Sequence, residues 1–430
     1  MSFQNFLEMG KIQDDDRWYS FGRIFVDHHT RRSFTRFHIV GKENIPKDGA
    51  CVFGSNHCNA LMDAMVLLAT SKQKKVFIAR ADVFKNPRTA KILKWLRILP
   101  IYRKRDGIGA VRDKNGEIID QAVDVIHDEV PLYLFPEATH RTKHSLRQLS
   151  KGIFHIALEA NAKFGNEKPV YIVPVGLEYG DYFRFRSTVL VNYGEPINVT
   201  EYVKEHEGEN EAITINALKA MLTERMAELI SYVPDDDDYD AIWEMTKIKA
   251  GSMPRTLKMK LHKNKEVIAK IVDFREKEPE KAKEVFEKVN EFAKHRKEQN
   301  ISVNSVAMRV PFLRTLWKSF LALLGLPIFV AAAAVSSPIW IIANLILKDL
   351  KDDAFRNTVN YGVEFVMHPL IMAVGVTLLF CLTPWKIAVL GSIFLYYSYV
   401  FYFDYMEYFR LLISDWRWTF NKKLRRELNF

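Results

Sequence analysis

The chain has 430 residues, of which 48% are hydrophobic, enough for a large core spread over two or three domains and too many for a mainly disordered protein. Its formal net charge of +10 suits either an anionic membrane surface or nucleic acid. The three cysteines, Cys51, Cys58 and Cys381, have no CxxC spacing, so the sequence indicates neither a disulfide framework nor a zinc site.

The beginning of the chain, MSFQNFLEMGKIQDDDRW, lacks the continuous apolar core of a signal peptide. We therefore expect the first part of the chain to remain on the cytosolic side of the membrane. Reduced, scattered cysteines favour the same reducing compartment.

Residues 35–198 alternate between short apolar runs rich in β-branched residues and amphipathic stretches. The runs predicted as strands are FHIV, CVFGS, KVFIAR, VPLYLF, VYIVPVGL and TVLVNYG, and the stretches predicted as helices are residues 61–71, 89–96, 116–128 and 151–164. Strands that alternate with helices predict an α/β layered domain, which we assign to residues 1–234 together with an N-terminal helical lead-in.

A charged segment follows the acidic turn VPDDDDYDA. Residues 235–310 are rich in Lys and Glu, and intrahelical pairs four residues apart support exposed helices. The prediction is a solvated helical hairpin. Because charges of both signs are mixed, this segment does not favour nucleic-acid binding.

Residues 311–430 have the composition of a membrane region. Three stretches, residues 319–347, 365–385 and 387–403, carry no Asp, Glu, Lys or Arg, and a membrane helix needs roughly 20 apolar residues. We therefore predict a C-terminal α-helical membrane region.

The basic residues predict how these stretches cross the membrane. Lysines and arginines flank the first stretch on both sides and fill the C-terminal tail, whereas only Lys386 lies between the second and third stretches. The positive-inside rule then places both flanks of the first stretch in the cytosol. We expect a re-entrant or interfacial hairpin at residues 319–347, broken near Pro327 and the SSP sequence at 336–338, followed by spanning helices at 365–385 and 387–403.

The stretch SNHCNALMDA, residues 55–64, places a histidine after a predicted strand and an aspartate in the next helix or its lead-in. A neutral imidazole, with a pKa near ~6.5, can take a proton from a hydroxyl at neutral pH. A carboxylate bonded to its other nitrogen fixes the tautomer and stabilises the imidazolium. His57 and Asp63 are therefore a candidate catalytic pair, although a structural histidine beside a capping turn explains the same residues when the stretch is taken alone.

Two later stretches suit anion binding. In LPIYRKRDG an apolar run ends in Arg103, and arginine in that position suits bidentate phosphate binding, with a solvated basic loop as the alternative. In LYLFPEATHRT a predicted strand runs into Glu137, Thr139 and Arg141, towards the helix that begins near Lys151. A strand that leads into a helix N-terminus is a common place for anion recognition in α/β folds.

A fourth stretch, YIVPVGLEYG, is a predicted strand interrupted by Pro174 and Gly176. In this order, the four stretches resemble the blocks of the glycerolipid acyltransferases typified by bacterial 1-acylglycerol-3-phosphate acyltransferase. Those blocks are a His and an Asp separated by four residues, a hydrophobic run ending in Arg, a Phe-Pro-Glu-Gly-Thr-Arg-Ser loop, and a late apolar run with Pro. The resemblance covers roughly residues 36–196.

The chain departs from the family pattern in two blocks. His57 and Asp63 are separated by five residues, which is similar to a branch that acylates glycerol 3-phosphate or dihydroxyacetone phosphate. The third block reads Phe-Pro-Glu-Ala-Thr-His-Arg, so Glu137 and Thr139 match the family residues directly and Arg141 lies one position beyond the family arginine.

The resemblance implies a membrane-bound O-acyltransferase that uses acyl-CoA or acyl-carrier protein, and no metal or other cofactor, to acylate glycerol 3-phosphate or 1-acylglycerol 3-phosphate. It implies that His57 is the general base oriented by Asp63, that Arg103 binds the acceptor phosphate, and that Glu137 organises the glycerol end. Three further substrate-binding candidates are Thr139, Arg141 and Lys151. The expected partners are the bilayer, the acyl donor and the phosphorylated acceptor, with the catalytic domain on the cytosolic face.

Other functions remain as alternatives. The enzyme could acylate another lysolipid, or the chain could be a non-catalytic membrane scaffold, which the altered third block allows. A lipid hydrolase is disfavoured because the sequence has no G-x-S-x-G nucleophile elbow. A cysteine nucleophile at Cys58 is disfavoured because neighbouring side chains point apart.

Overall fold

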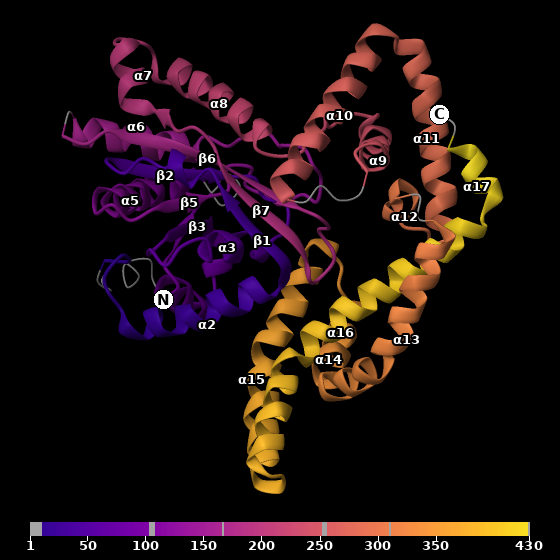
Figure 1. Cartoon of the computed structure of the whole chain (residues 1–430). Coiled ribbons are helices and arrows are strands. Elements are labelled where there is room, and N and C mark those ends of the chain that lie inside the picture. The colour runs from indigo at the N-terminus through magenta and orange to yellow at the C-terminus, as the bar shows by residue number, and fades with distance from the viewer. Residues whose placement is uncertain (1–10, 103–107, 166, 252–255, 309–310, 429–430) are drawn as a thin grey trace. The chain divides into compact units, whose positions relative to one another are not determined.

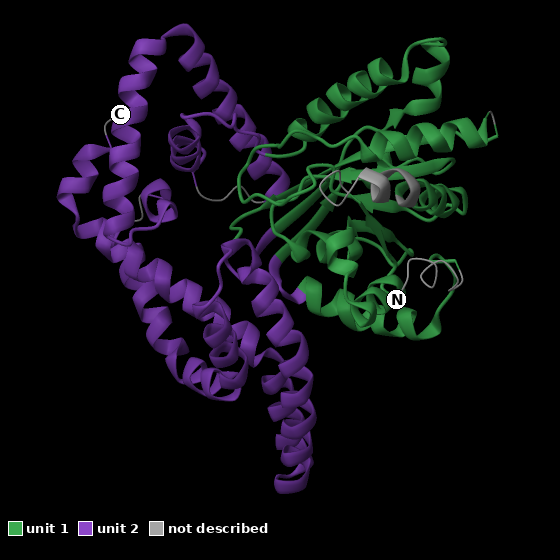
Figure 2. Cartoon of the chain, turned by 180° about the vertical axis from the view of Figure 1, so that it is seen from behind, with its two compact units in different colours: residues 1–31, 36–182, 189–230 green, residues 32–35, 183–188, 231–430 purple. Residues whose placement is uncertain are grey.

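The computed structural model describes residues 11–102, 108–165, 167–251, 256–308 and 311–428. The chain divides into two compact units, shown in Figure 2. Unit 1 comprises residues 1–31, 36–182 and 189–230, and unit 2 comprises residues 32–35, 183–188 and 231–430.

A mixed eight-stranded sheet forms the centre of the first part of the chain, in the order β1-β7-β6-β2-β5-β3-β4, with β8 paired to β6 (Figure 1). The central strand β2 is parallel to both β5 and β6, whereas β7 is antiparallel to β6. The predicted α/β class is therefore confirmed. The strands are β1 Phe34–Val40, β2 Ala50–Ser55, β3 Val76–Arg80, β4 Ile98–Ile101, β5 Leu132–Leu134, β6 Val170–Tyr179, β7 Ser187–Tyr193 and β8 Ile197–Asn198.

Helices cover both faces of this sheet. In Figure 1, α6, α7 and α8 lie along one side of the sheet, and α2 and α3 lie along the other. The helices are α2 Arg17–Arg32, α3 Leu61–Leu68, α4 Pro87–Trp95, α5 Ile108–His127, α6 Gly152–Phe164, α7 Val199–Glu205 and α8 Glu211–Glu228, with 3₁₀ turns at Lys42–Asn44 and Ala81–Phe84.

The core of unit 1 joins the central strands to α5, α6 and α8. Strand residues such as Val52 and Ile172 cluster with Ile126 of α5, Phe154 of α6 and Leu222 of α8, and each is fully or almost fully buried. Each such side chain contributes roughly 1.5–3 kcal/mol by leaving water. The 3.6-residue spacing of Ile118, Ala122 and Ile126 thus forms the buried face that the sequence predicts.

Two features of unit 1 differ from the expected elements. Strand β4 was not predicted: we expected this run only as an apolar approach to Arg103. The strand has four residues and contains Pro100, so its sequence gives no strand pattern. Helix α5 begins at Ile108, eight residues before the predicted start, since the exposed Gly116 does not interrupt it.

Pro174 and Gly176 are explained by the neighbours of β6. Pro174 lies between the segment of β6 that pairs with β7 and the segment that pairs with β8, and its carbonyl accepts a hydrogen bond from the Gly194 N–H at 3.0 Å. At this position the sheet needs no N–H donor from β6, so proline is tolerated. At Gly176 a Cβ atom would lie 2.5 Å from the Leu229 Cβ and 2.8 Å from the Leu229 carbonyl oxygen. Only glycine fits this close approach.

Unit 2 is helical apart from residues 32–35 and 183–188. Its helices are α9 Tyr239–Lys249, α10 Leu257–Lys277, α11 Pro279–Glu298, α12 Val303–Met308, α13 Phe312–Val335, α14 Ser337–Lys348, α15 Arg356–Leu382, α16 Trp385–Phe420 and α17 Lys422–Glu427, with a 3₁₀ turn at Asp353–Phe355. The charged segment does form a helical hairpin, α10 with α11, but one face of it is buried. Ile268, Phe286 and Val289 pack with Ile242 of α9, because apolar residues recur at helical spacing between the charges.

Three helices are long and apolar enough to cross a membrane by length and composition: residues 312–335, 353–382 and 385–420. Helix α13 continues through Pro327 and ends at Val335, so the break that we expected at Pro327 does not occur and the chain turns at Ser336 instead. Neighbouring helices can compensate the missing hydrogen bond of an internal proline. The short connection between α15 and α16 lies at Thr383 and Pro384, close to the predicted boundary.

Candidate active site

The candidate site lies where the central strand β2 ends and α3 begins. Beyond Ser55, the Asn56 carboxamide behaves like a further peptide group of the sheet: its Nδ2 donates to the Leu177 carbonyl at 3.0 Å and its Oδ1 accepts from the Leu177 N–H at 2.7 Å. These two hydrogen bonds to Leu177 of β6 fix the direction in which the chain leaves the sheet. His57 follows immediately.

His57 and Asp63 form a hydrogen-bonded pair. The His57 Nδ1 lies 2.8 Å from the Asp63 Oδ2, and the Asp63 side chain, in the first turn of α3, is 0% exposed. The same Oδ2 accepts the backbone N–H groups of Cys58 at 2.8 Å and Asn59 at 2.7 Å. The loop therefore wraps around the carboxylate, with Ala60 at a φ of 46°, and accommodates the additional residue between His57 and Asp63.

The second carboxylate oxygen of Asp63 is bonded by a residue distant in sequence. The Tyr179 hydroxyl, at the end of β6, donates to Asp63 Oδ1 at 2.8 Å. The sequence places Tyr179 in the stretch YIVPVGLEYG, but no pattern there pairs it with Asp63. Tyr179 is thus a site residue that sequence reasoning missed.

The His57 ring is held between two other rings. It stacks on Phe135 with centroids 4.3 Å apart, and the His140 ring lies edge-on at 5.6 Å. Its side chain is 18% exposed, and within the described part of the chain no group bonds Nε2. Since Nδ1 faces the carboxylate and carries the proton, Nε2 presents a lone pair suited to a general base.

Glu137 joins the histidine loop to the loop after β5. Its Oε1 accepts the His57 N–H at 2.9 Å, and its Oε2 accepts the Arg147 N–H at 3.0 Å. The side chain is 5% exposed, and this burial raises the pKa of Glu137 to about 7, although the two backbone donors oppose the rise. Both oxygens are thus engaged by the protein, so the described contacts of Glu137 position His57, and its expected contact with glycerol stays a prediction.

The rest of the third block forms a tight loop beside His57. The Arg141 N–H donates to the His57 carbonyl at 2.9 Å, and the Thr139 N–H donates to the Glu137 carbonyl at 2.8 Å. Ala138, where the family has glycine, has a φ of 62°, a conformation that costs alanine roughly 1–2 kcal/mol. The structure thus brings His57, Asp63, Glu137, Thr139 and Arg141 together.

Two other candidates lie differently. Lys151 is exposed at the residue before α6, where its carbonyl accepts the N–H groups of Phe154 and His155. Arg103 lies outside the described residues. Its predicted phosphate contact therefore stays a prediction.

Basic side chains hold the far end of α3, the helix that carries Asp63. Arg23 from α2 and the buried Lys75 both donate to the carbonyls of Leu68 and Ser71, and Lys42 donates to the carbonyl of Thr70 at 2.9 Å. Burial lowers the pKa of Lys75 to about 7. Donors at a helix C-terminus satisfy its last carbonyls and so fix α3 at both ends.

Cys58 is inert by its surroundings. Its side chain is buried, and burial together with the charges of Asp63 and Glu137 raises the pKa of Cys58 well above its ordinary value. A thiol of this kind does not supply a thiolate at neutral pH. The expectation that Cys58 is not the nucleophile agrees with this environment.

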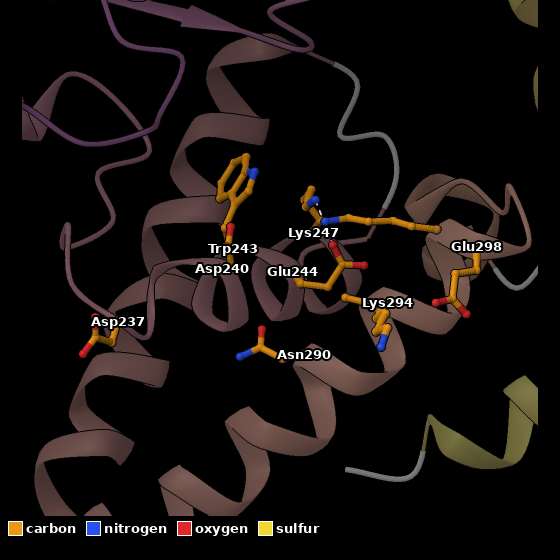
Figure 3. A pocket seen from close by; sticks show the side chains of 10 residues that line it. Asp237, Asp240, Trp243, Glu244, Lys247, Asn290, Lys294 and Glu298 are labelled. Atoms are coloured by element: carbon orange, nitrogen blue, oxygen red, sulfur yellow. Dashed lines mark ion pairs between the residues drawn. The ribbon is translucent and has the colours of Figure 1, made fainter.

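A cavity with a volume of about 460 Å³ lies between α9 and α11 of unit 2 (Figure 3). Lys247 pairs with Glu244 at 2.9 Å, and Glu244 is also bonded by Arg296 at 2.7 Å. The remaining charged side chains that line it are Asp237, Asp240, Lys294, Lys297 and Glu298. These are exposed charges of both signs, typical of a solvated surface, and the cavity contains no pairing of a base with a nucleophile.

The His–Asp pair at the end of the central strand suits proton transfer from a hydroxyl group. Comparisons with known proteins specify it further. Residues 36–178 match the family model described as Acyltransferase. A segment of 123 residues is 30% identical to "Glycerol-3-phosphate O-acyltransferase 2" of Saccharomyces cerevisiae (strain ATCC 204508 / S288c), which is 29% of this chain. Residues 36–178 therefore match an acyltransferase domain, in agreement with the resemblance of the four stretches to the glycerolipid acyltransferases.

The match to the yeast protein spans only 16% of that protein's length. Among solved structures, the crystal structure of the 1-acyl-sn-glycerophosphate (LPA) acyltransferase PlsC from Thermotoga maritima is similar over 53% of this chain and 86% of that chain, with 19% identity and a TM-score of 0.35. A TM-score this low adds nothing about activity or substrate.

Proposed function

We propose that the chain is a membrane-bound O-acyltransferase that moves a fatty acyl group from acyl-CoA or acyl-carrier protein to glycerol 3-phosphate or 1-acylglycerol 3-phosphate. One observation carries the proposal: in a domain that matches the acyltransferase family model, the Nδ1 of His57 is bonded to a fully buried carboxylate at 2.8 Å. This leaves Nε2 as the base.

The geometry suits direct transfer without a covalent enzyme intermediate. Nε2 of His57 takes the proton of an acceptor hydroxyl while that oxygen attacks the thioester carbonyl. The tetrahedral oxyanion collapses, the carbon–sulfur bond breaks, and the thiolate leaves with the proton that His57 returns. Asp63 stabilises the imidazolium throughout, and its own position is fixed by Cys58, Asn59 and Tyr179.

The yeast relative's name supports glycerol 3-phosphate as the acceptor. Arg103, which immediately follows the described segment that contains β4, is the side chain that we assign to its phosphate, because arginine binds phosphate bidentately. Thr139 and Arg141, in the loop beside His57, and Lys151, before α6, are the further candidates for the phosphorylated end.

Apolar surface of unit 1 supports attachment to a bilayer, in addition to the three apolar helices of unit 2. On α2, Trp18, Phe21 and Ile24 are 79%, 72% and 70% exposed, and Ile92 and Trp95 of α4 are exposed as well. The two helices are adjacent, since Nε1 of Trp95 in α4 donates to Oδ2 of Asp16, the residue before α2, at 2.8 Å. The exposed basic residues in and next to these two helices are Arg17, Lys85, Arg88 and Lys91. Aromatic and basic residues together favour an anionic lipid interface.

The deciding experiment is acyl transfer by the purified full chain. It is incubated with radiolabelled acyl-CoA or acyl-carrier protein and, separately, with glycerol 3-phosphate, 1-acylglycerol 3-phosphate and other lysolipids. His57→Ala is expected to lower the rate by roughly 10²–10⁴-fold, which is the contribution of general base catalysis.

The same experiment separates the alternatives. A wild-type chain that transfers no acyl group to any acceptor would favour a non-catalytic scaffold, and transfer that survives His57→Ala would contradict the assigned base. A preference for an acceptor without phosphate would contradict the role of Arg103.

A further inference from the structure

Phe135, the residue that follows β5, lies flat against the candidate base. Its ring and the His57 imidazole are stacked, with centroids 4.3 Å apart and an angle of 17° between the ring planes. The contact covers a face of the imidazole and leaves its edge, which carries both nitrogens, to Asp63 and the acceptor. The proposed mechanism uses this edge and assigns no role to the stacked face.

The backbone around Phe135 is fixed by the fold. Its carbonyl accepts the Ala138 N–H at 3.0 Å. The following residue, Pro136, restricts Phe135 to extended backbone conformations. Because β5 is parallel to the neighbouring β2, the residues that follow the two strands leave the sheet at the same edge. The ring is therefore held against His57 before any reactant binds.

The stack gains importance because the charge of His57 changes during the proposed reaction. The imidazole is neutral until it takes the proton of the acceptor hydroxyl, and it is then an imidazolium until it returns that proton. The face of an aromatic ring carries partial negative charge and attracts a cation within about 6 Å of its centroid. This attraction arises only once the proton moves, and an interaction that is stronger in the transition state than in the ground state raises the rate.

We infer that Phe135 is a positioning residue that acts through His57: its ring face stabilises the imidazolium that forms during acyl transfer. The inference rests on the proposed function, in which His57 is the base. Other titratable groups also face His57: Asp63 at Nδ1, Glu137 at the backbone N–H and His140 through its ring. A test must therefore change the charge on the Phe135 face and leave these neighbours as they are.

Fluorinated phenylalanines meet this condition. Fluorine withdraws electrons from the ring face at nearly constant shape, so 4-fluoro-, 3,5-difluoro- and 3,4,5-trifluorophenylalanine at position 135 weaken the attraction stepwise. The kcat of the full chain, with the acceptor that the wild type prefers, should fall with each added fluorine and by roughly 2- to 5-fold in total. A ring that only packs would leave kcat unchanged throughout the series, and that result would overturn the inference.

Phe53 of β2 provides the matched control. Its ring stacks on Tyr133 with centroids 4.4 Å apart and an interplanar angle of 14°, which is nearly the same geometry. Tyr133, however, gains no proton in the proposed reaction. The same three amino acids at position 53 should therefore leave kcat unchanged. An equal stepwise fall at both positions would show an effect of fluorine on packing and would contradict the inference.

The pH dependence gives a second readout, which packing alone does not move. When the imidazolium is stabilised less, it loses its proton at lower pH. Fluorination of Phe135 should therefore shift the acidic limb of kcat/KM to lower pH, by roughly 0.4–0.7 unit for the trifluoro ring. A limb at the same pH in every form would show that the ring face does not act on the charge of His57.

Failure of the proposed function gives a different result. A wild-type chain that acylates no acceptor contradicts that function, whereas the protonation of His57 can still be followed by NMR of isotope-labelled histidines in the full chain. The His57 signal is assigned by its loss in His57→Gln. A lower titration midpoint in the trifluoro form supports the inference, and an unchanged midpoint overturns it.

Discussion

The hydrogen bonds of Asp63 allow a substitution that removes the negative charge of the side chain but keeps its hydrogen-bonding geometry. Three N–H groups, from His57, Cys58 and Asn59, converge on Oδ2, whereas Oδ1 faces the Tyr179 hydroxyl, which can accept as well as donate. In Asp63→Asn the amide oxygen can keep the Oδ2 position and the amide nitrogen can donate to Tyr179. The His57 tautomer is then preserved and only the negative charge is lost.

We therefore expect Asp63→Asn to lower kcat by roughly 10²-fold and Asp63→Ala by about 10⁴-fold, the larger loss arising because the ring orientation is lost too. Tyr179→Phe removes one donor worth about 1 kcal/mol and should lower kcat about fivefold. Steady-state acyl transfer by the three variants measures these values. Equal losses in the asparagine and alanine variants would contradict the separation of charge from orientation.

Glu137 predicts a pH dependence of stability. Burial raises its pKa from 4.5 to about 7 in the folded state, so the unfolded chain loses this proton at lower pH than the folded chain does. A raised folded pKa stabilises the fold below the unfolded pKa, and this stabilisation is lost as the pH rises from about 4.5 to about 7. A shift of this size corresponds to roughly 3 kcal/mol.

The measurement is the unfolding free energy, or the unfolding midpoint, of wild type and Glu137→Gln between pH 4.5 and 8. The wild type should lose more stability than the variant over this range, and the difference between them should level off above pH 7. In Glu137→Gln the side-chain amide N–H faces the backbone N–H of Arg147. Two donors that face each other lower the stability of the variant by about 1 kcal/mol at every pH. Parallel curves would show that Glu137 does not titrate in this range.

At the scale of single residues, the sequence predicts the His–Asp pair but not every group that places it. His57, Asp63 and Glu137 are recognisable because their types and order fit the blocks of the acyltransferases. Tyr179 is not, because a tyrosine 116 positions beyond Asp63 has no local pattern.

At the scale of elements, β6 is limited by its contact with the chain after α8. A Cβ atom at Gly176 would lie 2.5 Å from Leu229 Cβ, and backbone atoms of Leu229 stand within 3.0 Å, so the neighbour cannot move away as a flexible side chain would. Gly176→Ala should therefore destabilise unit 1 by roughly 1–3 kcal/mol.

Gly116 provides the matched control. It is exposed in α5 and has nothing within 4 Å of its added Cβ, so Gly116→Ala should stabilise the protein by about 0.5–1 kcal/mol through helix propensity. Thermal unfolding of the two variants should shift in opposite directions. If Gly176→Ala left the unfolding temperature unchanged, β6 and Leu229 would have to separate readily.

The elements were predictable where periodicity is strong, as in α5 and the long strand β6. Elements whose structure depends on tertiary contacts were not predictable. Strand β4 is four residues that are paired in parallel with β3, and the helices of the charged segment bury Phe286 and Val289, which a count of charges hides.

At the scale of the whole molecule, the packing inside unit 2 bears on how many times the chain crosses the membrane. Helix α16 has 36 residues and is about 54 Å long, whereas the hydrocarbon core of a bilayer is about 30 Å thick. Only part of it can be embedded. Its first half packs on α15, where Leu395 contacts Gly375 and Leu379 contacts Gly391.

The second half of α16 is charged and packs on α13. Lys318 of α13 pairs with Asp415 at 2.6 Å, and the Tyr408 hydroxyl donates to the Lys318 carbonyl at 2.8 Å. After α16, α17 returns to the helices that precede α13, since Glu427 bonds His295 of α11 at 2.9 Å. The beginning of α13 and the end of α16 thus lie at the same side, which requires an even number of crossings between them.

We therefore expect α15 and the first half of α16 to be the two crossings, with α13 and α14 at the cytosolic interface. In a variant with Cys51 and Cys381 replaced by serine, a membrane-impermeant thiol reagent should label Lys351→Cys and Lys423→Cys from the same side as Lys204→Cys of unit 1. Lys386→Cys should be labelled from the opposite side. Three complete crossings would reverse the result at residues 351, 386 and 423, because each would then lie on the other face of the bilayer, so a single set of labelled vesicles distinguishes the two arrangements.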